Sequence, residues 1–331
     1  MNRAARNRRN WTRFLGLVVA LLLPIVFQDA YLRNILVIFG IYCLLALSLN
    51  IIVGYIGEVS LGHAAFFGLG GYASAILSKT VGFPVLLSIP SAVVISGILG
   101  LFIGYLALRL RGPYFAITTL AFAEIIRLIV TNWVDLTRGP LGFTQIPPLV
   151  LGIPGWFEFK VMSELRYYYF VLVLVGLVFL LIYNVVHSPT GRTFLAIREQ
   201  EPLARSVGIS PFRYRVLAFV ISTMIAGLAG AAYAHFFRII SPDINMVYYS
   251  AIPLMMVMVG GRGTLLGPFL GALLFAVLPE LFRTAGTIRM VFFASFLLAT
   301  IVYMPEGIAV KIQTFIRDWE TKKSPQELGD V

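Results

Sequence analysis

Charged residues are scarce in this 331-residue sequence: only 12% are Asp, Glu, Lys or Arg, whereas 59% are hydrophobic. A soluble domain carries about 25% charged and about 45–50% apolar residues. The apolar excess lies in continuous runs of about 20 residues, the length that crosses a bilayer as a helix. Only helices and closed barrels satisfy their backbone in lipid, and continuous rather than alternating runs favour helices. The composition therefore predicts an all-α, polytopic transmembrane helical bundle.

Cysteine, histidine and the motifs of common enzymes are also rare or missing. The one cysteine, Cys43, lies inside an apolar run, so the chain cannot form an internal disulfide framework. The three histidines are far apart and lack the H-E-x-x-H spacing of zinc proteases, and no Gly-Lys dipeptide exists to form a phosphate-binding loop. We therefore predict no catalytic residue, no metal and no cofactor, and no ATP hydrolysis by this chain.

Positive charge is unevenly distributed along the chain. Lys and Arg cluster in residues 1–13, at Arg109 and Arg111, across 187–215 and across 311–323. Such clusters mark the cytoplasmic side of a membrane protein, so the net charge of +11 requires no nucleic-acid partner. We expect about ten spans, with both termini in the cytoplasm. The expected spans are 11–27, 34–54, 58–78, 84–108, 113–132, 166–186, 214–236, 247–262, 264–282 and 288–304.

This topology divides the chain into three parts. A basic cytoplasmic amino end, 1–13, precedes a transmembrane domain, 14–310, and no signal-peptide cleavage site follows the first apolar stretch. A cytoplasmic tail, 311–331, completes the expected arrangement. Within the transmembrane domain, 133–165 is the longest outside loop and 187–213 is the longest inside loop.

Glycine is concentrated in two segments, 50–77 and 256–274. Each contains V-G-x-x-G followed a few residues later by L-G. The similarity suggests an internal repeat, which many transporters possess. Chance similarity between two glycine-rich packing segments is the alternative.

Polar residues stand among the glycines of the first segment. We select Gly57, Glu58, Ser60 and His63 as candidates to line a substrate path within a broken helix. An ionisable side chain at membrane depth costs roughly 2.5–3.5 kcal/mol, which favours a function for it. Two other interpretations stay open: Glu58 in a solvated turn at the cytoplasmic edge, and His63 in a packing role.

Glu124 is a further candidate for the substrate path. It lies three residues before Arg127, so the two side chains share a helix face and can pair. Either charge alone in lipid would be costly, which favours pairing or exposure to water. An ion pair that fixes neighbouring helices is the alternative.

The inside loop 187–213 contains helix signals although it is too polar to span. Phe194 and Ile197 share one helix face, Pro202 suits the first turn of a second short helix, and Gly208 suits its end. Two short amphipathic helices between spans favour docking of a soluble partner. A solvated loop that folds without a partner is the alternative.

Segments spread along the chain resemble the permease subunits of ABC importers for branched-chain amino acids, in particular the M-type (LivM-like) permeases. The resembling segments are 47–75, 111–128, 137–143, 190–209, 214–234 and 256–274. The resemblance implies the ABC importer permease fold in a bacterial inner membrane. It also implies a sister permease subunit, two cytoplasmic ATPase subunits that bind ATP and Mg, and a periplasmic substrate-binding protein. Permeases for urea, short amides or aromatic acids, and an ion-coupled secondary transporter, are the alternatives.

Under this resemblance, the inside loop would contact the ATPase. The expected contact residues are Phe194, Ile197 and Leu203 as apolar anchors, Arg198 and Glu201 at the rim, and Ala204 and Gly208. ABC importer permeases often show Glu-Ala-Ala, three residues and then Gly. Only Ala204 and Gly208 match that pattern, so the pattern does not fix which residues touch the ATPase.

Overall fold

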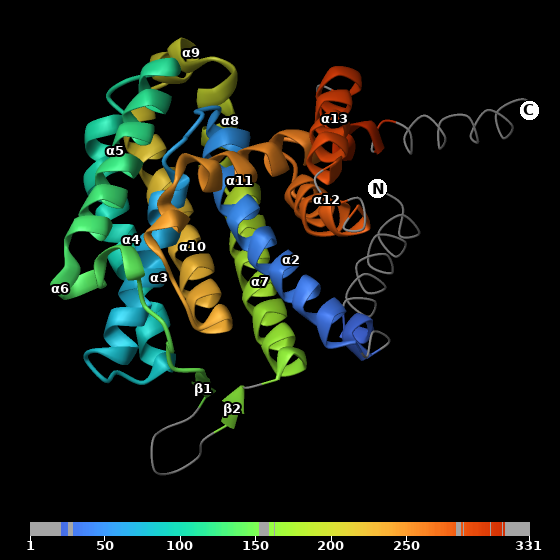
Figure 1. Cartoon of the computed structure of the whole chain (residues 1–331). Helices are drawn as coiled ribbons and strands as arrows, with labels where there is room; N and C mark the ends of the chain where they lie inside the picture. The colour runs from blue at the N-terminus through green and yellow to red at the C-terminus, as the bar shows by residue number, and fades with distance from the viewer. Residues whose placement is uncertain are drawn as a thin grey trace, which may run out of the picture.

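The computed structural model describes residues 21–25, 29–151, 159–161, 163–282, 286, 288–304, 306–312 and 314 (Figure 1). The helices of the first half are α2 (Ala30–Asn50), a π-helix (Ile51–Ile56), α3 (His63–Lys79), α4 (Val85–Ala107) and α5 (Pro113–Asn132). Those of the second half are α7 (Glu164–His187), α8 (Pro189–Glu199), α9 (Glu201–Ser206), α10 (Pro211–Phe237), α11 (Val247–Gly260), α12 (Gly267–Leu281) and α13 (Ile288–Tyr303). The expected amino end 1–13 and most of the tail 311–331 lie outside the described residues. Of the expected span 11–27, only 21–25 are described, and they are helical.

Five helices in the described ranges are long and apolar enough to cross a membrane. They are Ala30–Ile56, Val85–Ala107, Pro113–Asn132, Glu164–His187 and Pro211–Phe237. α11 and α12 are apolar but shorter. The predicted helical membrane bundle is therefore confirmed, whereas the number of ten spans stays a prediction.

Most helix bounds follow the apolar runs closely, and the expected span 58–78 is the exception. The helix in that region, α3, begins only at His63, because residues 57–62 are irregular. Gly57 has φ +86°, a left-handed conformation that glycine adopts without strain and that ends the preceding helix. The glycine-rich sequence thus shortens the helix and leaves a break at its start.

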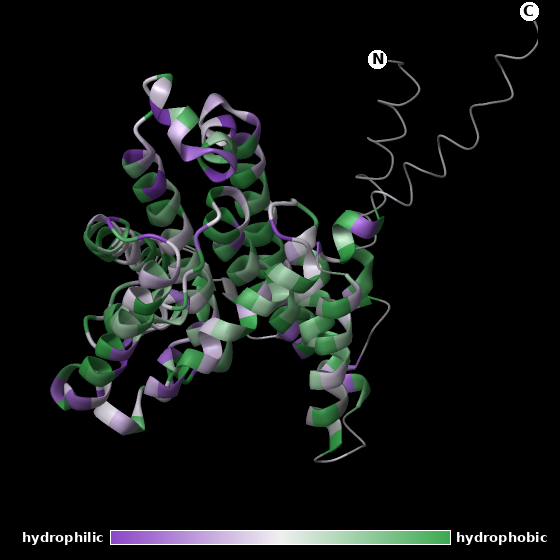
Figure 2. Ribbon diagram, turned by 90° about the horizontal axis from the view of Figure 1, so that it is seen from above, coloured by the Kyte–Doolittle hydropathy of each residue, from purple (hydrophilic) through white to green (hydrophobic). Residues whose placement is uncertain are grey.

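α10 lies at the centre of the bundle, against α2, α3 and α4. Its contact with α3 depends on small residues: a Cβ added to Gly230 would lie 1.7 Å from the Phe67 carbonyl oxygen. Such close backbone approach is how helices pack in lipid, where the hydrophobic effect does not drive them together. The helices are hydrophobic along most of their length (Figure 2), and many of their exposed residues are apolar. For example, Ile98 of α4 is 62% exposed and Val173 of α7 is 60% exposed.

The segment 133–165 contains short elements that the all-α prediction missed. They are α6 (Val134–Thr137), a 3₁₀ turn (Gly139–Leu141) and the antiparallel strands β1 (Leu149–Leu151) and β2 (Phe159–Val161). Strands of three residues are too short to give a recognisable alternating pattern. In Figure 1 this hairpin lies at one end of the bundle and α9 lies at the other. The described parts of the loops 133–165 and 187–213 therefore lie at opposite ends of the bundle.

Candidate functional site

Two irregular segments interrupt the bundle, and the second of them meets the π-helix that precedes the first. Residues 57–62 precede α3, and residues 261–266 connect α11 to α12. A Cβ added to Gly54 would lie 2.4 Å from the backbone nitrogen of Gly263. Gly263 itself has φ +74°, where an L side chain would be strained. Glycine at these positions therefore allows the two backbones to touch.

Asn50 joins the end of α2 to the second irregular segment by hydrogen bonds. It is buried at the end of α2, with only 1% of its surface exposed. Its Oδ1 accepts from the Gly263 N–H at 2.9 Å, and its Nδ2 donates to the Thr264 carbonyl oxygen at 2.9 Å. Both ends of the buried amide are thus satisfied. The two V-G-x-x-G motifs, 53–57 and 259–263, are consequently in direct contact.

Arg198 of α8 reaches into this contact. Its Nη1 donates a hydrogen bond to the carbonyl oxygen of Gly54, which lies in the last turn of a helix, where carbonyls lack intrahelical donors. A Cβ on Gly57 would lie 3.1 Å from Cγ of Arg198, and one on Gly263 would lie 2.7 Å from its Nη1. We call the contact between residues 54–57 and residues 261–264, together with Asn50 and Arg198, the glycine junction.

Arg198, expected at the rim of a partner contact, makes these contacts within the chain, and its position at a partner surface stays a prediction. The guanidinium points into the chain and touches backbone from both halves of the sequence. Helix periodicity places a residue on a face, but it does not show whether that face meets the same chain or another protein. Only the close approach of α8 to residues 54–57 decides this.

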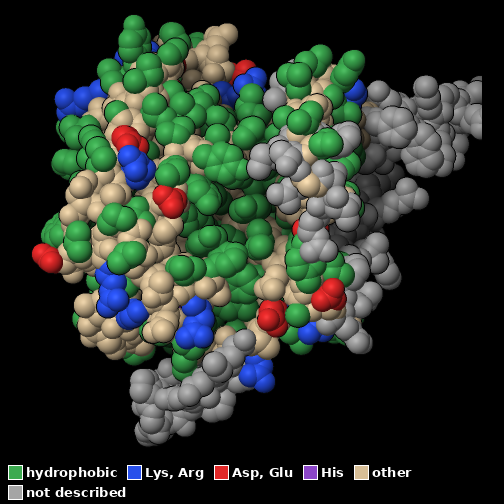
Figure 3. Space-filling view, viewed as in Figure 1, with side chains coloured by type: hydrophobic (Ala, Val, Ile, Leu, Met, Phe, Trp, Pro, Cys, Tyr) green, Lys and Arg blue, Asp and Glu red, His purple; other side chains and the backbone are tan. Residues whose placement is uncertain are grey.

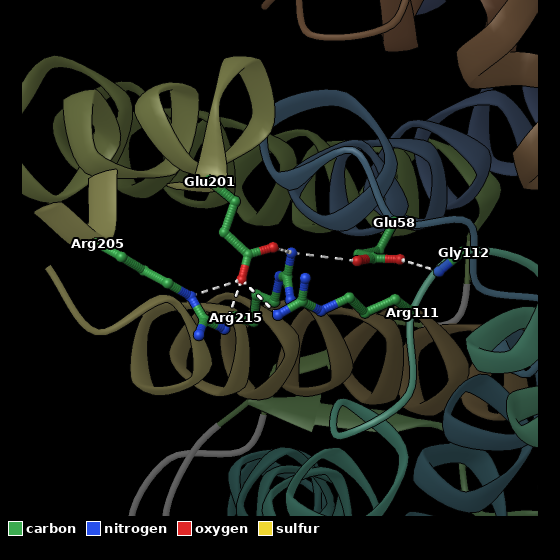
Figure 4. Close-up of polar contacts among 6 residues, drawn as sticks. All are labelled: Glu58, Arg111, Gly112, Glu201, Arg205 and Arg215. Atoms are coloured by element: carbon green, nitrogen blue, oxygen red, sulfur yellow. Dashed lines mark hydrogen bonds and ion pairs between the residues drawn. The ribbon is translucent and has the colours of Figure 1, made fainter. Parts of the chain in front are cut away.

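A buried ion network connects α9 to the first irregular segment (Figure 4). Arg215 of α10 has 8% of its side chain exposed, and its Nη2 lies 2.6 Å from Oε2 of Glu201 and 3.5 Å from Oε1 of Glu58. Oε2 of Glu58 also accepts a hydrogen bond from the N–H of Gly112 at 3.2 Å. Glu58 is therefore buried and paired, which corrects the alternative of a solvated turn.

Glu201, expected at the rim of a contact, is instead the centre of this network. Its Oε1 accepts from Arg111 at 2.7 Å and from Arg205 at 2.8 Å, in addition to the Arg215 contact at Oε2. Burial alone would raise the pKa of the Glu201 carboxyl, but Arg205, Arg215 and Arg111 outweigh it and lower the pKa below its ordinary value of 4.5. The carboxylate therefore stays ionised at neutral pH and fixes α9 to α10 and to the start of α5.

The other predicted path residues lie in two places. Ser60 and His63 are buried in and after the first irregular segment, and Nε2 of His63 lies 2.7 Å from Oγ of Ser48. Within the described residues, the hydroxyl of Ser60 has no hydrogen-bond partner. Glu124 lies apart from them on α5. It pairs there with Arg127, whose Nε is 2.9 Å from Oε2 of Glu124. A role of these residues in a substrate path stays a prediction.

The expected apolar anchors of the loop divide into two groups. Phe194 and Ile197 are buried within the chain, 1% and 3% exposed, and the Phe194 ring packs edge-on against Tyr214. They fix α8 to the bundle, so their side chains are not available to a partner. Leu203 does face outward, with 61% of its surface exposed, whereas Ala204 is buried.

The outward apolar surface of the loop comes from α9 and the turn after it. Leu203 and Val207, 61% and 71% exposed, lie four residues apart and so share a face. Gly208 ends α9 with φ +84°, as predicted. A shallow groove of about 440 Å³ follows this turn, and its lining residues are Val207, Gly208, Ile209, Ser210, Arg213, Tyr214 and Leu217. The Leu203–Val207 spacing was visible in the sequence, and it is the signal that would have identified this surface.

A second hollow lies within the span region of the bundle. An apolar pocket of about 120 Å³ opens between α2, α3, α10 and α11, and Figure 3 shows hydrophobic side chains gathered in a hollow of this view. Its lining residues are Ile38, Ile41, Tyr42, Leu45, Phe67, Tyr233, Phe237, Tyr249 and Ile252. In the described part of the chain, no group of three His, Cys, Asp or Glu side chains could hold a metal ion. The lining of the pocket itself suits an apolar group.

The comparison with protein families adds to this geometry. The family described as the permease component of the branched-chain amino acid transport system matches residues 31–304. The chain belongs to this family. The match includes both sides of the glycine junction and the whole of α8 and α9. The protein is thus a membrane permease and not an enzyme.

Named relatives agree with the family. The chain is 34% identical to the high-affinity branched-chain amino acid transport system permease protein LivM of Salmonella typhimurium, over 81% of this chain and 67% of the relative. It is equally similar to LivM of Escherichia coli. It is also 25% identical to the permease protein LivH of Escherichia coli, over 81% of this chain and 90% of the relative. No solved structure matches the chain with significant similarity.

Proposed function

We propose that the chain is one of two permease subunits of an ATP-driven ABC importer that moves branched-chain amino acids across a bacterial inner membrane. The sister permease completes the path, two cytoplasmic ATPases bind ATP and Mg, and a periplasmic protein delivers the substrate. The chain itself binds no cofactor. It crosses the membrane about ten times, with α8, α9 and both termini in the cytoplasm and 133–165 outside.

This proposal rests on two features of the loop formed by α8 and α9. The loop presents an apolar surface outward, and polar contacts attach it to the bundle. Leu203 and Val207 present an apolar surface outward, while Arg198 and Glu201 attach the same loop to the breaks in the spans. A soluble partner that moves α9 would therefore act on the helix ends beside the path. An ion-coupled secondary transporter has no need for such an attachment.

The substrate proposal rests on the apolar pocket and on the relatives. The pocket is lined by isoleucine, leucine and aromatic side chains, and the polar groups among its lining side chains are tyrosine hydroxyls. Such walls suit an aliphatic side chain better than urea or a short amide, which need hydrogen-bond partners. LivM and LivH relatives are named for branched-chain amino acid transport.

Reconstitution tests the function directly. We expect proteoliposomes that contain the chain, its sister permease and the ATPases to take up leucine, isoleucine and valine when ATP is inside and the binding protein is outside. An ATPase variant that binds but does not hydrolyse ATP is the control. Uptake that persists without ATP and collapses with a proton or sodium gradient would overturn the ABC proposal. A preference for urea or phenylalanine would contradict the proposal that branched-chain amino acids are the substrate.

The docking surface has its own test. We expect the double substitution Leu203→Asp and Val207→Asp to reduce co-purification of the ATPases by about tenfold or more, because a charge would enter an apolar contact. The exposed residue Leu195, on α8, supplies a matched control as Leu195→Asp. Equal loss in both variants, or none in either, would contradict docking through α9.

A further inference from the structure

The ion pair on α5 differs from every other charged contact described above, because it lies within a span and faces outward. Glu124 and Arg127 are 44% and 27% exposed in their side chains. Glu124 lies about 17 Å along a helix of about 30 Å, so it is near the middle of α5. Among the described residues, the side chains of this pair hydrogen-bond to each other, from Nε of Arg127 at 3.0 and 2.9 Å and from its Nη2 at 2.5 Å.

A lipid-facing position would be costly for this pair. Insertion scales assign roughly 2.5–3.5 kcal/mol to a charged residue at the centre of a span. α7 shows what a lipid-facing surface of this chain looks like. Its exposed residues include Val173, Leu177 and Leu180, and residues 167–186 contain no Asp, Glu, Lys or Arg. The outward face of α5 differs from it by the ion pair, which lies among exposed apolar residues such as Ile117 and Leu128.

The charged face continues toward the apolar pocket. Asp243 is exposed in the turn Pro242–Asn245 before α11, the helix that carries Tyr249. Tyr249 is one of the residues that line the pocket. The turn Pro242–Asn245 packs against both α3 and α5. A body that covered the α5 pair would thus also border the opening of the pocket.

We propose that the outward face of α5, centred on Glu124 and Arg127, is the surface on which the sister permease packs. This inference rests on the proposed two-permease importer. The mid-span position excludes the soluble ATPases and the binding protein. A second protein of the same fold is available, because the chain matches both LivM and LivH of Escherichia coli. The ion pair then lies between the two permeases, where it is shielded from lipid.

The first experiment removes both charges together. In the double variant Glu124→Leu with Arg127→Leu, we expect co-purification of the sister permease to fall by about tenfold, while the amount of the chain in the membrane is unchanged. Leucine is compatible with lipid, so this variant should insert at least as well as the wild type. The matched control is Leu177→Ala with Leu180→Ala on α7, which should retain the sister permease.

The second experiment measures what covers the face. Single cysteines carry nitroxide labels in a Cys43→Ala background, and collisions with oxygen dissolved in lipid are measured by electron paramagnetic resonance. Ile117 and Leu128 lie within about 40° of Glu124 around α5 and are 61% and 46% exposed. We expect labels there to become protected when the sister permease is present, while a label at Leu177 of α7 stays accessible.

The outcomes separate this inference from the proposed function. Labels on α5 that stay accessible to lipid in the complex, together with normal co-purification of the Leu variant, would overturn the inference. Protection of these labels when the chain is expressed alone would also overturn it, in favour of a second copy of this chain. A complex that protects the labels but transports no branched-chain amino acid would contradict the proposed substrate and support the proposed interface.

Discussion

Two groups of charged side chains in this chain have opposite surroundings. Glu58, Glu201 and Arg215 come from three parts of the chain and are about 90% buried, and Arg215 pairs with both carboxylates. Glu124 and Arg127 are partly exposed and bonded only within one helix turn. The first group has its partners within the chain, so its role is to hold the loop to the bundle. The second faces outward at membrane depth, which marks a surface that another protein completes.

Removal of Arg215 should expose this difference most strongly. Arg215→Ala leaves two buried carboxylates without their shared cation, so we expect the free energy of unfolding to fall by about 3–5 kcal/mol. The double substitution Glu124→Leu with Arg127→Leu should change the stability of the isolated chain by less than about 1 kcal/mol. Thermal unfolding in detergent measures both. Equal losses would show that burial does not distinguish the two groups.

Substitution of a junction glycine sharpens the contrast between packed and exposed regions. In Gly54→Ala the new Cβ would lie 2.4 Å from the backbone of Gly263, which cannot yield as a side chain can, so we expect a loss of about 1–3 kcal/mol. Gly176 of α7 has no atom within 4 Å of a Cβ, and Gly176→Ala should stabilise the helix by about 0.5–1 kcal/mol. Unfolding midpoints of the two variants should move in opposite directions. A stabilised Gly54→Ala variant would mean that the two backbones do not touch.

Substitution of Arg198 tests whether the loop transmits its movement to the spans. Arg198→Ala removes the contact with Gly54 and Gly263 but leaves Leu203 and Val207 in place. We expect uptake to fall by about tenfold, with ATPase co-purification retained and hydrolysis no longer stimulated by the binding protein. Arg192→Ala, an exposed arginine on the same helix, is the control and should be near normal. Loss of ATPase binding in Arg198→Ala would instead place this side chain at the partner surface.

Lowering the pH should give the smallest effect on the free energy of unfolding. The arginines lower the pKa of Glu201, so its contribution to stability is present above the unfolded value of about 4.5 and is lost as the pH falls through the lower folded value. We expect the stability difference between wild type and Glu201→Gln to be constant between about pH 6 and 8 and to narrow below about pH 4.5. A difference that narrows instead as the pH rises above 8 would contradict the ion network.

Local signals predicted the parts of the fold that are local in origin. Apolar runs gave the bounds of α4, α5, α7 and α10 to within a few residues, because helix formation in lipid depends on a continuous apolar segment. Pro202 and Gly208 correctly marked the start and end of α9, since each fixes a backbone conformation by itself. The i, i+3 spacing also identified the pair on α5.

Contacts between distant segments could not be predicted in the same way. Arg215 gave no sign that it would meet Glu58 and Glu201, because the bundle brings their helices together only after folding. Phe194 and Ile197 were correctly placed on one apolar face of α8, but periodicity could not say that the same chain covers this face. For the same reason, the sequence did not predict that Arg198 contacts Gly54 in the glycine junction.

The hydrogen bonds of Asn50 can form only late in the synthesis of the chain. Its amide is made early, whereas both of its partners belong to residues 263 and 264, which leave the ribosome much later. Until then a buried amide lacks both bonds, at a cost of about 1–3 kcal/mol. We expect chains arrested before residue 263 to be degraded faster in a pulse-chase experiment than chains arrested after residue 270. Equal degradation of the two chains would show that the hydrogen bonds of Asn50 do not limit the stability of the unfinished protein.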